Sequence, residues 1–355
     1  MPLAGAHCTI VPPHLLDRLA RGADLALRAP ARQTLQLDAD WRNRRRFRTP
    51  RGPAPGGRAP RARTPGEVLR PDRIVHDAEG GRTLPGTRLR SEGEEPVGDA
   101  AVDRAYDGLG ATFALFADVW SRDSVDGAGL PLSGTVHYGR RYANAFWDGG
   151  RMVFGDGDGV VFNDFTLAVD VIGHELSHGV VQYTADLAYE GQSGALNESV
   201  SDVFGSLVKQ RVLGQSAAEA DWLIGAELFT DRVNGRALRS LAEPGTAYDD
   251  DTLGRDPQPA HMDDYVRTNA DNGGVHINSG IPNRAFHLTA TALGGRAWER
   301  AGQVWYDALT AGGLRPDAGF GDFAAATTEA ASSRYGRGDE YRAVREAWRR
   351  VGVPR

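Results

Sequence analysis

His174-Glu175-Leu176-Ser177-His178 lies inside an apolar run, residues 167–182, whose pattern is typical of a helix. Residues four apart on an α-helix lie on one face, so both histidine rings can point at one ion. Glu198 follows twenty residues after the second histidine. Two imidazoles and a carboxylate are the three protein ligands of one kind of catalytic zinc site, whose fourth position holds water. Glu175 points in a different direction and could take a proton from that water.

A second run supplies partners for the two histidines. Glu198 and Asp202 are four residues apart, so both can face the same site. A metal-bound histidine usually donates its other N–H to a carboxylate or carbonyl, so we expect Asp202 to accept from His174. Asn197 stands in the same relation to His178. A solvated helix with paired histidines would give the same pentad, but the flanking valines, isoleucine and leucine predict a buried helix. Two histidines on a buried helix need polar partners.

Further stretches of the chain resemble a known family. Together with the pentad they are similar to the thermolysin-like zinc peptidases, closest to the protealysin-like branch, over residues 73–353. The stretches are residues 105–110 (AYDGLG), 144–149 (NAFWDG), 155–159 (GDGDG), 193–198 (SGALNE) and 271–280 (DNGGVHINSG). Their order and spacing carry the resemblance. It implies an α+β, two-lobed metallopeptidase with a mixed N-terminal lobe, a mainly helical C-terminal lobe and the zinc helix between them.

The resemblance implies a role for each matching residue near the metal. His174, His178 and Glu198 match the ligands of one catalytic zinc ion. Glu175 matches the general base, which later returns the proton. Helical spacing gave the same positions above, so the resemblance agrees with the reading from the residues.

Three more residues match groups that stabilise the oxyanion. His276 and Tyr189 match the two donors, and Asp271 matches the partner that orients His276. A charged imidazole would stabilise negative charge developing on a carbonyl oxygen. A loop histidine is usually only solvated and a tyrosine is often only half-buried, so these roles rest on the resemblance.

Substrate contacts are implied as well. Asn144 and the Ala145 carbonyl match anchors of the substrate backbone, and Arg239 matches the arginine that holds a carbonyl on the leaving-group side. The alternatives are an ordinary strand end and a surface charge. The positions that match the primary specificity pocket are all apolar, which predicts cleavage on the amino side of bulky hydrophobic residues. They are Phe162, Val171, Ile224, Leu228 and Leu238.

One departure from the family concerns calcium. Relatives rich in calcium carry an acidic cluster near the active site, of which Asp170 and Asp221 remain here. Lys209, Leu223 and Ala226 occupy positions where carboxylates would be needed, and Ca²⁺ takes six to eight oxygen ligands. We therefore expect the double calcium site to be absent, with the lysine amine in place of its charge. Whether calcium binds elsewhere stays open.

Composition and charge divide the chain. Its 355 residues are 41% hydrophobic, which suits two globular lobes and an appendage. Residues 1–70 hold 14 Arg and 5 acidic residues, a net of +9, whereas the remainder has a net of −15. A single cysteine excludes an internal disulfide framework, and no stretch approaches the eighteen or so apolar residues of a membrane helix. We place boundaries at 1–70, 71–184 and 185–353.

The first segment is predicted to inhibit the rest. A short amphipathic helix begins in residues 8–27, and Pro12-Pro13-His14-Leu15 is similar to the signature of short protealysin-like propeptides. Residues 42–70 are rich in Arg, Pro and Gly and read as a linker where cleavage would release the pro-segment. No aromatic interleaving supports nucleic-acid binding. Whether Cys8 contacts zinc in the zymogen stays open.

The expected protein is a monomeric zinc endopeptidase made as a zymogen, acting on proteins or peptides, with the pro-segment as intramolecular inhibitor and no nucleic-acid or membrane partner. Because the leader has no apolar signal region, we expect secretion by a route without a classical signal peptide, or else a cytoplasmic enzyme. Two other functions stay open. An aminopeptidase would share the metal motif, although no Gly-x-Met-Glu-Asn run is present. An inactive relative would bind a partner and hold zinc structurally.

Overall fold

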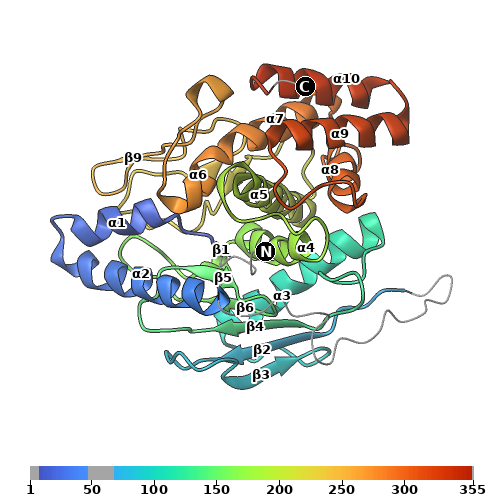
Figure 1. Ribbon diagram of the computed structural model, residues 1–355. Helices are drawn as coiled ribbons and strands as arrows, with labels where there is room; N and C mark the ends of the chain where they lie inside the picture. The colour runs from blue at the N-terminus through green and yellow to red at the C-terminus, as the bar shows by residue number, and fades with distance from the viewer. Residues whose placement is uncertain (1–7, 47–67, 354–355) are drawn as a thin grey trace.

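The metal helix predicted from the pentad forms at the centre of the molecule. The structure is a computed structural model that describes residues 8–46 and 68–353. Helix α4 (Val169–Gln182) packs along α5 (Gly191–Leu213), which ends at a left-handed glycine, Gly214. Figure 1 shows the sheet below α4 and the C-terminal helices above α5.

Glycines let α4 and α5 approach closely. A Cβ at Gly205 would lie 2.4 Å from the backbone oxygen of Asp170 and 3.0 Å from the backbone nitrogen of His174. A Cβ at Gly173 would lie 3.1 Å from the Gly205 Cα. Real side chains do not tolerate the shorter of these distances, so the two backbones can meet only where both residues lack a Cβ. This contact brings the carboxylates of α5 next to the histidines of α4.

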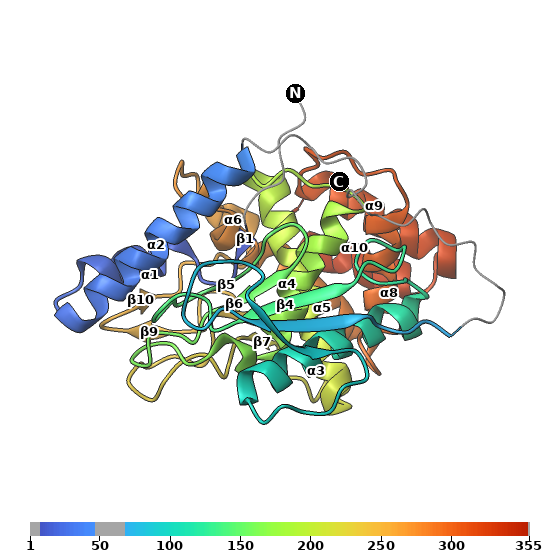
Figure 2. The ribbon, with the colours of Figure 1, turned by 90° about the horizontal axis from the view of Figure 1, so that it is seen from below.

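The N-terminal lobe is built on a six-stranded sheet with the order β1-β5-β6-β4-β2-β3. Strand β4 runs parallel to β2 and β6, whereas β1–β5, β5–β6 and β2–β3 are antiparallel. The strands are β1 (Cys8–Thr9), β2 (Arg73–Asp77), β3 (Thr87–Ser91), β4 (Leu132–Val136), β5 (Ala145–Trp147) and β6 (Met152–Phe154). The first described residues of the chain thus form an edge of the catalytic sheet (Figure 2).

Helix α3 (Ala100–Ala114) contacts β2, β4 and α4 and continues into a π-helical turn, η1 (Leu115–Val119). Asp99 caps its N-terminus by accepting two backbone N–H groups. The other oxygen of Asp99 lies 3.2 Å from Nε2 of His137, whose Nδ1 lies 2.8 Å from an oxygen of Asp156. His137 therefore bridges two carboxylates at the start of α3.

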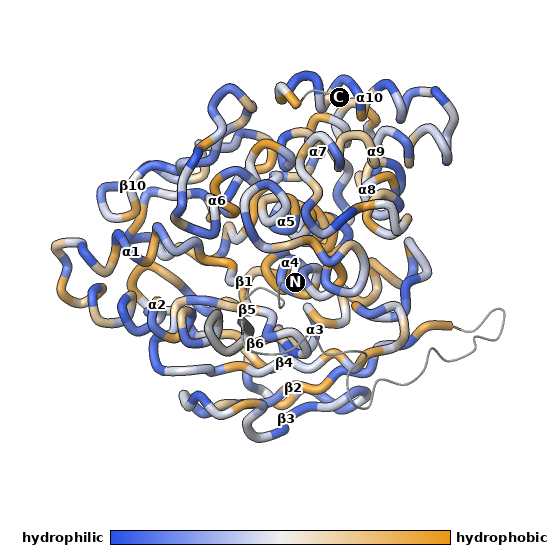
Figure 3. The backbone as a smooth tube through the Cα atoms, in the orientation of Figure 1, coloured by the Kyte–Doolittle hydropathy of each residue, from blue (hydrophilic) through white to orange (hydrophobic). Residues whose placement is uncertain are grey.

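The C-terminal lobe is helical and shares one hydrophobic core with the sheet lobe. Its α-helices are α6 (Asp271–Asn278), α7 (Gly280–Leu293), α8 (Ala301–Thr310), α9 (Phe320–Tyr335) and α10 (Asp339–Arg350). Shorter pieces are η2 (Phe165–Leu167), β7 (Leu223–Ile224), β8 (Arg239–Ser240), β9 (Asp249–Asp250), β10 (Gly254–Arg255) and η3 (Met262–Asp264). Figure 3 shows apolar residues along α4, α5 and α7 and mostly polar ones on the outer α10. The predicted α+β, two-lobed architecture is confirmed.

The pro-segment is more helical than predicted. A short helix was expected, and α1 (Pro13–Arg21) provides it, but α2 (Leu25–Arg46) follows and extends into the stretch read as linker. Tertiary contacts fix this second helix despite Pro30 within it. The backbone N–H of Ala143, for example, donates to the hydroxyl of Thr34 at 3.1 Å. Residues 47–67 of the predicted linker lie outside the described residues.

Three local predictions are corrected. The glycine-rich run of residues 155–159 predicts the turn of a hairpin, but β6 ends before it, and the carboxylate of Asp158 instead accepts the N–H groups of the following turn. His276 lies in a helical turn of α6, after three residues with left-handed backbone, and not in a loop. The apolar spacing predicts a helix over residues 297–309, but α8 begins at Ala301. No helix of the described chain is long and apolar enough to span a membrane.

Candidate active site

Three buried side chains from α4 and α5 converge. Nε2 of His174 and Nε2 of His178 are 3.0 Å apart. The carboxylate oxygens of Glu198 lie 3.6 Å from the first nitrogen and 3.5 Å from the second. Ligand atoms of a tetrahedral zinc ion with bonds of about 2.0–2.2 Å are about 3.3–3.5 Å apart. The three atoms are therefore spaced to bind one such ion.

Hydrogen bonds on the far side of each ring determine which nitrogen is protonated. Nδ1 of His174 lies 2.8 Å from an oxygen of Asp202, and Nδ1 of His178 lies 2.8 Å from Oδ1 of Asn197. The amide of Asn197 is oriented by donation from Nδ2 to the Leu187 carbonyl at 3.1 Å. Both Nδ1 atoms therefore carry hydrogen, and the two Nε2 lone pairs face each other.

The two facing Nε2 lone pairs are stabilised if a cation binds to both. Two lone pairs at 3.0 Å repel unless a positive ion lies between them. Glu198 Oε2 is buried and has no hydrogen-bond partner among the described residues. Burial is the largest cause that holds the pKa of His178 well below its ordinary value, so the ring is neutral as a metal ligand must be. These residues fit a zinc ion.

Asp202 connects His174 to Arg239 and Asn283. Besides His174, it accepts Nε and Nη2 of Arg239, each at 2.8 Å, and Nδ2 of Asn283 at 2.8 Å. Burial alone would raise the pKa of Asp202, but the charge of Arg239 and the hydrogen bonds lower it. Arg239 is only 1% exposed, which excludes the surface-charge reading of that residue.

Glu175 lies beside the cluster without joining it. Its Oε2 accepts the backbone N–H of Trp147 at 3.0 Å, and its Oε1 has no hydrogen-bond partner among the described residues. Burial, and then the charge of Glu198, raise the pKa of Glu175 well above its ordinary value. A carboxylate with a raised pKa can accept and return a proton near neutral pH.

Tyr189 and His276 lie beside Glu198. The Tyr189 hydroxyl is hydrogen-bonded to Glu198 and lies 3.3 Å from Nε2 of His276. Asp271 contacts His276 twice, at Nδ1 (2.6 Å) and at the backbone N–H (2.9 Å). Burial lowers the pKa of His276, but the charges of Asp271 and Glu198 outweigh it and raise the pKa to about 9. The ring therefore carries a positive charge.

The expected substrate contacts are occupied by the start of the chain. Asn144, the Ala145 carbonyl and Arg239 all hydrogen-bond to the backbone of Ile10 or Val11. The five residues that match the specificity pocket are buried in the same hydrophobic cluster as Ile10. They are Phe162, Val171, Ile224, Leu228 and Leu238.

The cluster read as a lost calcium site surrounds an amine. Nζ of Lys209 lies 2.8 Å from Asp170 and 3.0 Å from Asp221, and donates to the Leu223 carbonyl at 2.6 Å. Burial lowers the pKa of Lys209, but the two carboxylates outweigh this and raise it. The lysine is therefore charged and has oxygen ligands of the kind that a cation takes.

Two side chains of the pro-segment also make polar contacts with the catalytic lobes. Asp38 on α2 accepts from Nδ2 of Asn144 at 3.0 Å and from the Tyr142 hydroxyl at 2.5 Å. His14 on α1 lies 3.0 Å from the Tyr248 hydroxyl, and burial lowers its pKa to about 4. Each contact joins segments more than 100 residues apart, and we find no local sequence signal that would have predicted it.

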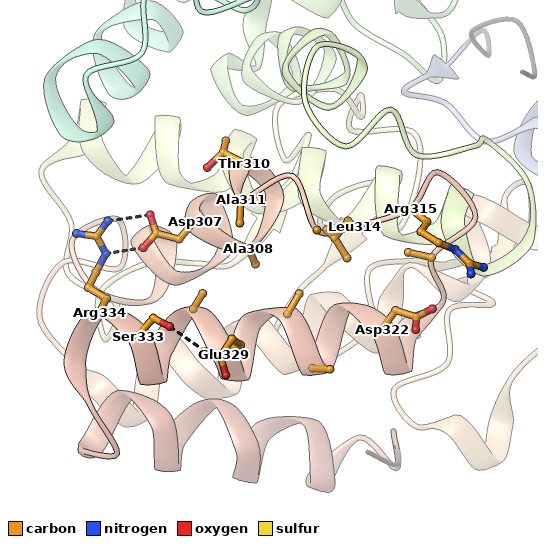
Figure 4. A pocket seen from close by; sticks show the side chains of 15 residues that line it. Asp307, Ala308, Thr310, Ala311, Leu314, Arg315, Asp322, Glu329, Ser333 and Arg334 are labelled. Carbon is orange, nitrogen blue, oxygen red and sulfur yellow. Dashed lines mark hydrogen bonds and ion pairs between the residues drawn. The ribbon is translucent and has the colours of Figure 1, made fainter.

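A groove elsewhere on the molecule is not part of this site. It lies between α8 and α9, lined largely by alanines, with Arg334 paired to Asp307 at one end and Arg315 at the other (Figure 4). No histidine lies in its lining, and both arginines already have carboxylate partners. Among the described residues, the lining of the groove therefore provides no histidine and no unpaired arginine for catalysis or anion binding.

Comparisons with known proteins agree with this geometry. Two family models match, the catalytic domain of thermolysin metallopeptidase over residues 75–182 and its alpha-helical domain over residues 185–353. The "Extracellular metalloprotease" of Pectobacterium carotovorum subsp. carotovorum is 50% identical over 347 residues, 98% of this chain and 96% of that protein. "Protease PrtS" of Photorhabdus is 52% identical over 283 residues, 79% of this chain and 76% of that protein. Among solved structures, the precursor of protealysin, a metalloproteinase from Serratia proteamaculans, matches with a TM-score of 0.87 and 49% identity, covering 98% of this chain and all of that one.

Proposed function

The chain belongs to the thermolysin metallopeptidase family, and from this premise we propose that it is a zinc endopeptidase made as a zymogen, cutting on the amino side of bulky hydrophobic residues. The proposal rests on one observation. The Nε2 atoms of His174 and His178 face each other, and Oε2 of Glu198, which has no hydrogen-bond partner among the described residues, lies beside them. One zinc ion is expected there, with Asn197 and Asp202 orienting the histidines.

Bound zinc would supply a Lewis acid that polarises a carbonyl and makes water nucleophilic at neutral pH. Glu175 accepts the proton of the attacking water at its open Oε1 and returns it to the leaving nitrogen. His276, charged and held by Asp271, stabilises the oxyanion together with Tyr189. Burial of the whole cluster strengthens each of these interactions, because water no longer screens them.

The preference for bulky residues is supported by the lining of the pocket. Its five side chains are apolar and at most 1% exposed, so a hydrophobic side chain gains the full benefit of leaving water there. Arg239 and Asn144 would fix the substrate backbone on the leaving-group side. An aminopeptidase would need an acidic anchor for a free amine, and the resemblance supplies none.

Latency is proposed to come from residues 1–70, which would act as an intramolecular inhibitor. Their described part places β1, α1 and α2 against the catalytic lobes, with Asp38 holding Asn144. We propose removal of this segment by cleavage within the Arg-rich stretch. Relatives named as extracellular support secretion of this chain as well. We further propose a monomer that needs no calcium at the Lys209 cluster and binds neither nucleic acid nor membranes.

The decisive experiment compares the wild-type chain with Glu175→Gln after trypsin trimming of the Arg-rich stretch. We expect casein hydrolysis by the wild type, its loss with chelator, and its return with zinc. Glu175→Gln should bind zinc equally but lose at least a hundredfold in kcat, as expected for removal of a general base. Cleavage of N-blocked peptides distinguishes an endopeptidase from an aminopeptidase. Full activity of Glu175→Gln would refute the mechanism.

A further inference from the structure

The backbone of Ile10 and Val11 binds the residues that match the family's substrate anchors, Asn144, Ala145 and Arg239. We propose that the Thr9–Ile10 peptide bond occupies the reacting position, and that the protein cuts this bond in itself. The inference rests on the proposed function and goes beyond inhibition by the pro-segment, because it names a bond that the site hydrolyses and a clipped form that remains latent.

Strand pairing sets the direction of the segment. Strand β1 lies antiparallel to β5, with Cys8 opposite Trp147 and Thr9 opposite Phe146. The backbone N–H of Ile10 continues the ladder by donating to the Ala145 carbonyl at 3.2 Å. An extended peptide added to a sheet edge is held by main-chain hydrogen bonds and read through its side chains. The segment therefore lies in a single register.

Side-chain contacts then locate the bond. Nε2 of His276, the proposed oxyanion donor, lies 3.0 Å from the carbonyl oxygen of Thr9. Nη1 of Arg239, the proposed ligand of the leaving-group side, donates to the carbonyl oxygen of Ile10 at 3.0 Å. The bond between the Thr9 carbonyl carbon and the Ile10 nitrogen lies between these two contacts. One residue farther on, the N–H of Val11 donates to Oδ1 of Asn144 at 2.9 Å.

The side chains agree with this register. Ile10 is 0% exposed, so a bulky hydrophobic side chain that is shielded from water follows the bond, as the proposed preference requires. Cys8 precedes the bond by one residue and packs with Tyr189 and Val275. Its sulfur lies within 4.8 Å of ligand atoms of His178 and Glu198, which makes thiolate binding to the metal the competing arrangement.

The reaction is a balanced hydrolysis. The oxygen of water bonds to the Thr9 carbonyl carbon while Glu175, held at Oε2 by the N–H of Trp147, takes one water proton. The bond from that carbon to the Ile10 nitrogen breaks, and Glu175 passes the proton to the leaving nitrogen. The second water proton also passes to the released amine, so the products are a carboxylate at Thr9 and an ammonium group at Ile10. One water is consumed and nothing is oxidised or reduced.

The clipped protein would keep its inhibitor. Leu15, Leu16 and Leu19 of α1 are fully buried, and Asp38 of α2 still binds Asn144, so residues 10–46 remain across the leaving-group side of the cleft. Only residues 1–9 are released. Activity toward other proteins then still requires a second cut in the Arg-rich stretch.

The sequence offers a direct probe, because Thr9–Ile10 is the single Thr-Ile pair in the chain. Full-length protein labelled with carbonyl-¹³C threonine and ¹⁵N isoleucine gives one coupled amide correlation. We expect that signal to vanish when zinc is added to chelator-treated protein. Intact mass should fall by residues 1–9, and N-terminal sequencing should begin at Ile10, with no gain in casein hydrolysis.

Matched variants make the result decisive. Ile10→Leu should be cut like the wild type, whereas Ile10→Asp should stay intact, with circular dichroism showing that both are folded. In Glu175→Gln the correlation should persist and shift on zinc addition, which reports the contact without any turnover. If trimmed protein hydrolyses casein while the Thr9–Ile10 signal of the full chain survives zinc, the inference fails and the proposed function stands. A sulfur-to-metal absorption band in the cobalt-loaded chain that disappears in Cys8→Ser would overturn it equally.

Discussion

Lys209 occupies a position where calcium-binding relatives would need a carboxylate. Its buried amine allows a test of how much this positive charge contributes to the free energy of unfolding. Lys209 is the single lysine of the chain, and its side chain is 4% exposed. Replacing it by methionine keeps most of the volume and removes the charge together with the hydrogen bond to the Leu223 carbonyl. Asp221 is 43% exposed and should lose at most about 1 kcal/mol. Asp170 is 0% exposed, and removing the partner of a buried charge costs about 3–5 kcal/mol.

The expected change in unfolding temperature follows from the chain length. With an unfolding entropy of about 2.1 cal/mol/K per residue, 355 residues give about 0.7 kcal/mol/K, so Lys209→Met should lower Tm by about 4–7 °C. The melts are best recorded in the Glu175→Gln background, where self-digestion is prevented. Arg211→Met is the control, because Arg211 lies on the same helix and pairs with Asp118 at 2.6 Å on the surface.

Comparing Lys209→Met with Arg211→Met distinguishes the stability contributed by a buried ion pair from that of an exposed ion pair. Arg211→Met should cost less than about 1 kcal/mol, since Asp118 is 61% exposed. Lys209→Met with Asp170→Asn should regain much of the loss, because no buried charge is then left alone. Calcium should leave the wild-type Tm unchanged if the amine stands in for the ion. Equal, small losses in Lys209→Met and Arg211→Met would refute the reasoning.

Two further predictions concern groups that hold the site and the sheet. Asp202→Asn leaves Arg239 without its charge partner and weakens the orientation of His174. Zinc affinity, measured in competition with a chromophoric chelator, should therefore fall about 10–100-fold. Unchanged affinity would show that Asp202 is not needed for zinc binding. Burial lowers the pKa of His137, but the two carboxylates that it bridges outweigh this and raise it. Stability from this bridge is therefore complete below pH 6.5 and lost as pH rises through the higher folded value. The carboxylates of Asp99 and Asp156 are 38% and 45% exposed, so the free energy of unfolding of the wild type should exceed that of His137→Gln by no more than about 1 kcal/mol at pH 6. The two free energies should converge at alkaline pH. A difference that grows as pH rises would contradict this.

The convergence of His174, His178 and Glu198 was predictable because helical spacing converts sequence into geometry. His174 and His178 share a face for any α-helix, and Asp202 lies one turn from Glu198 for the same reason. The order of the family motifs supplied the remaining positions, and the family assignment itself is confirmed by the matches that cover both lobes. Local periodicity thus fixed the residues within each helix.

What could not be read were contacts between distant segments. Helix α2 contains Pro30, which interrupts a run of good helix formers, so the local sequence predicts a shorter helix than the structure shows. The contact between Asp38 and Asn144 spans 106 residues. Arg239 looked like a possible surface charge because the letters around it give no sign that Asp202 lies opposite. Such pairings depend on how two lobes and a pro-segment come together.

Arg239 links the occupancy of the cleft to the metal site. Its Nε and Nη2 are fixed on Asp202, which in turn orients His174, while Nη1 binds the carbonyl of Ile10. A lysine could not serve both, because only the planar guanidinium offers a rigid fork and a further donor. If Ile10 left, Nη1 would be free to donate to water or to a substrate carbonyl, while Nε and Nη2 stay on Asp202. The same guanidinium could therefore bind the pro-segment and then a substrate carbonyl without releasing Asp202.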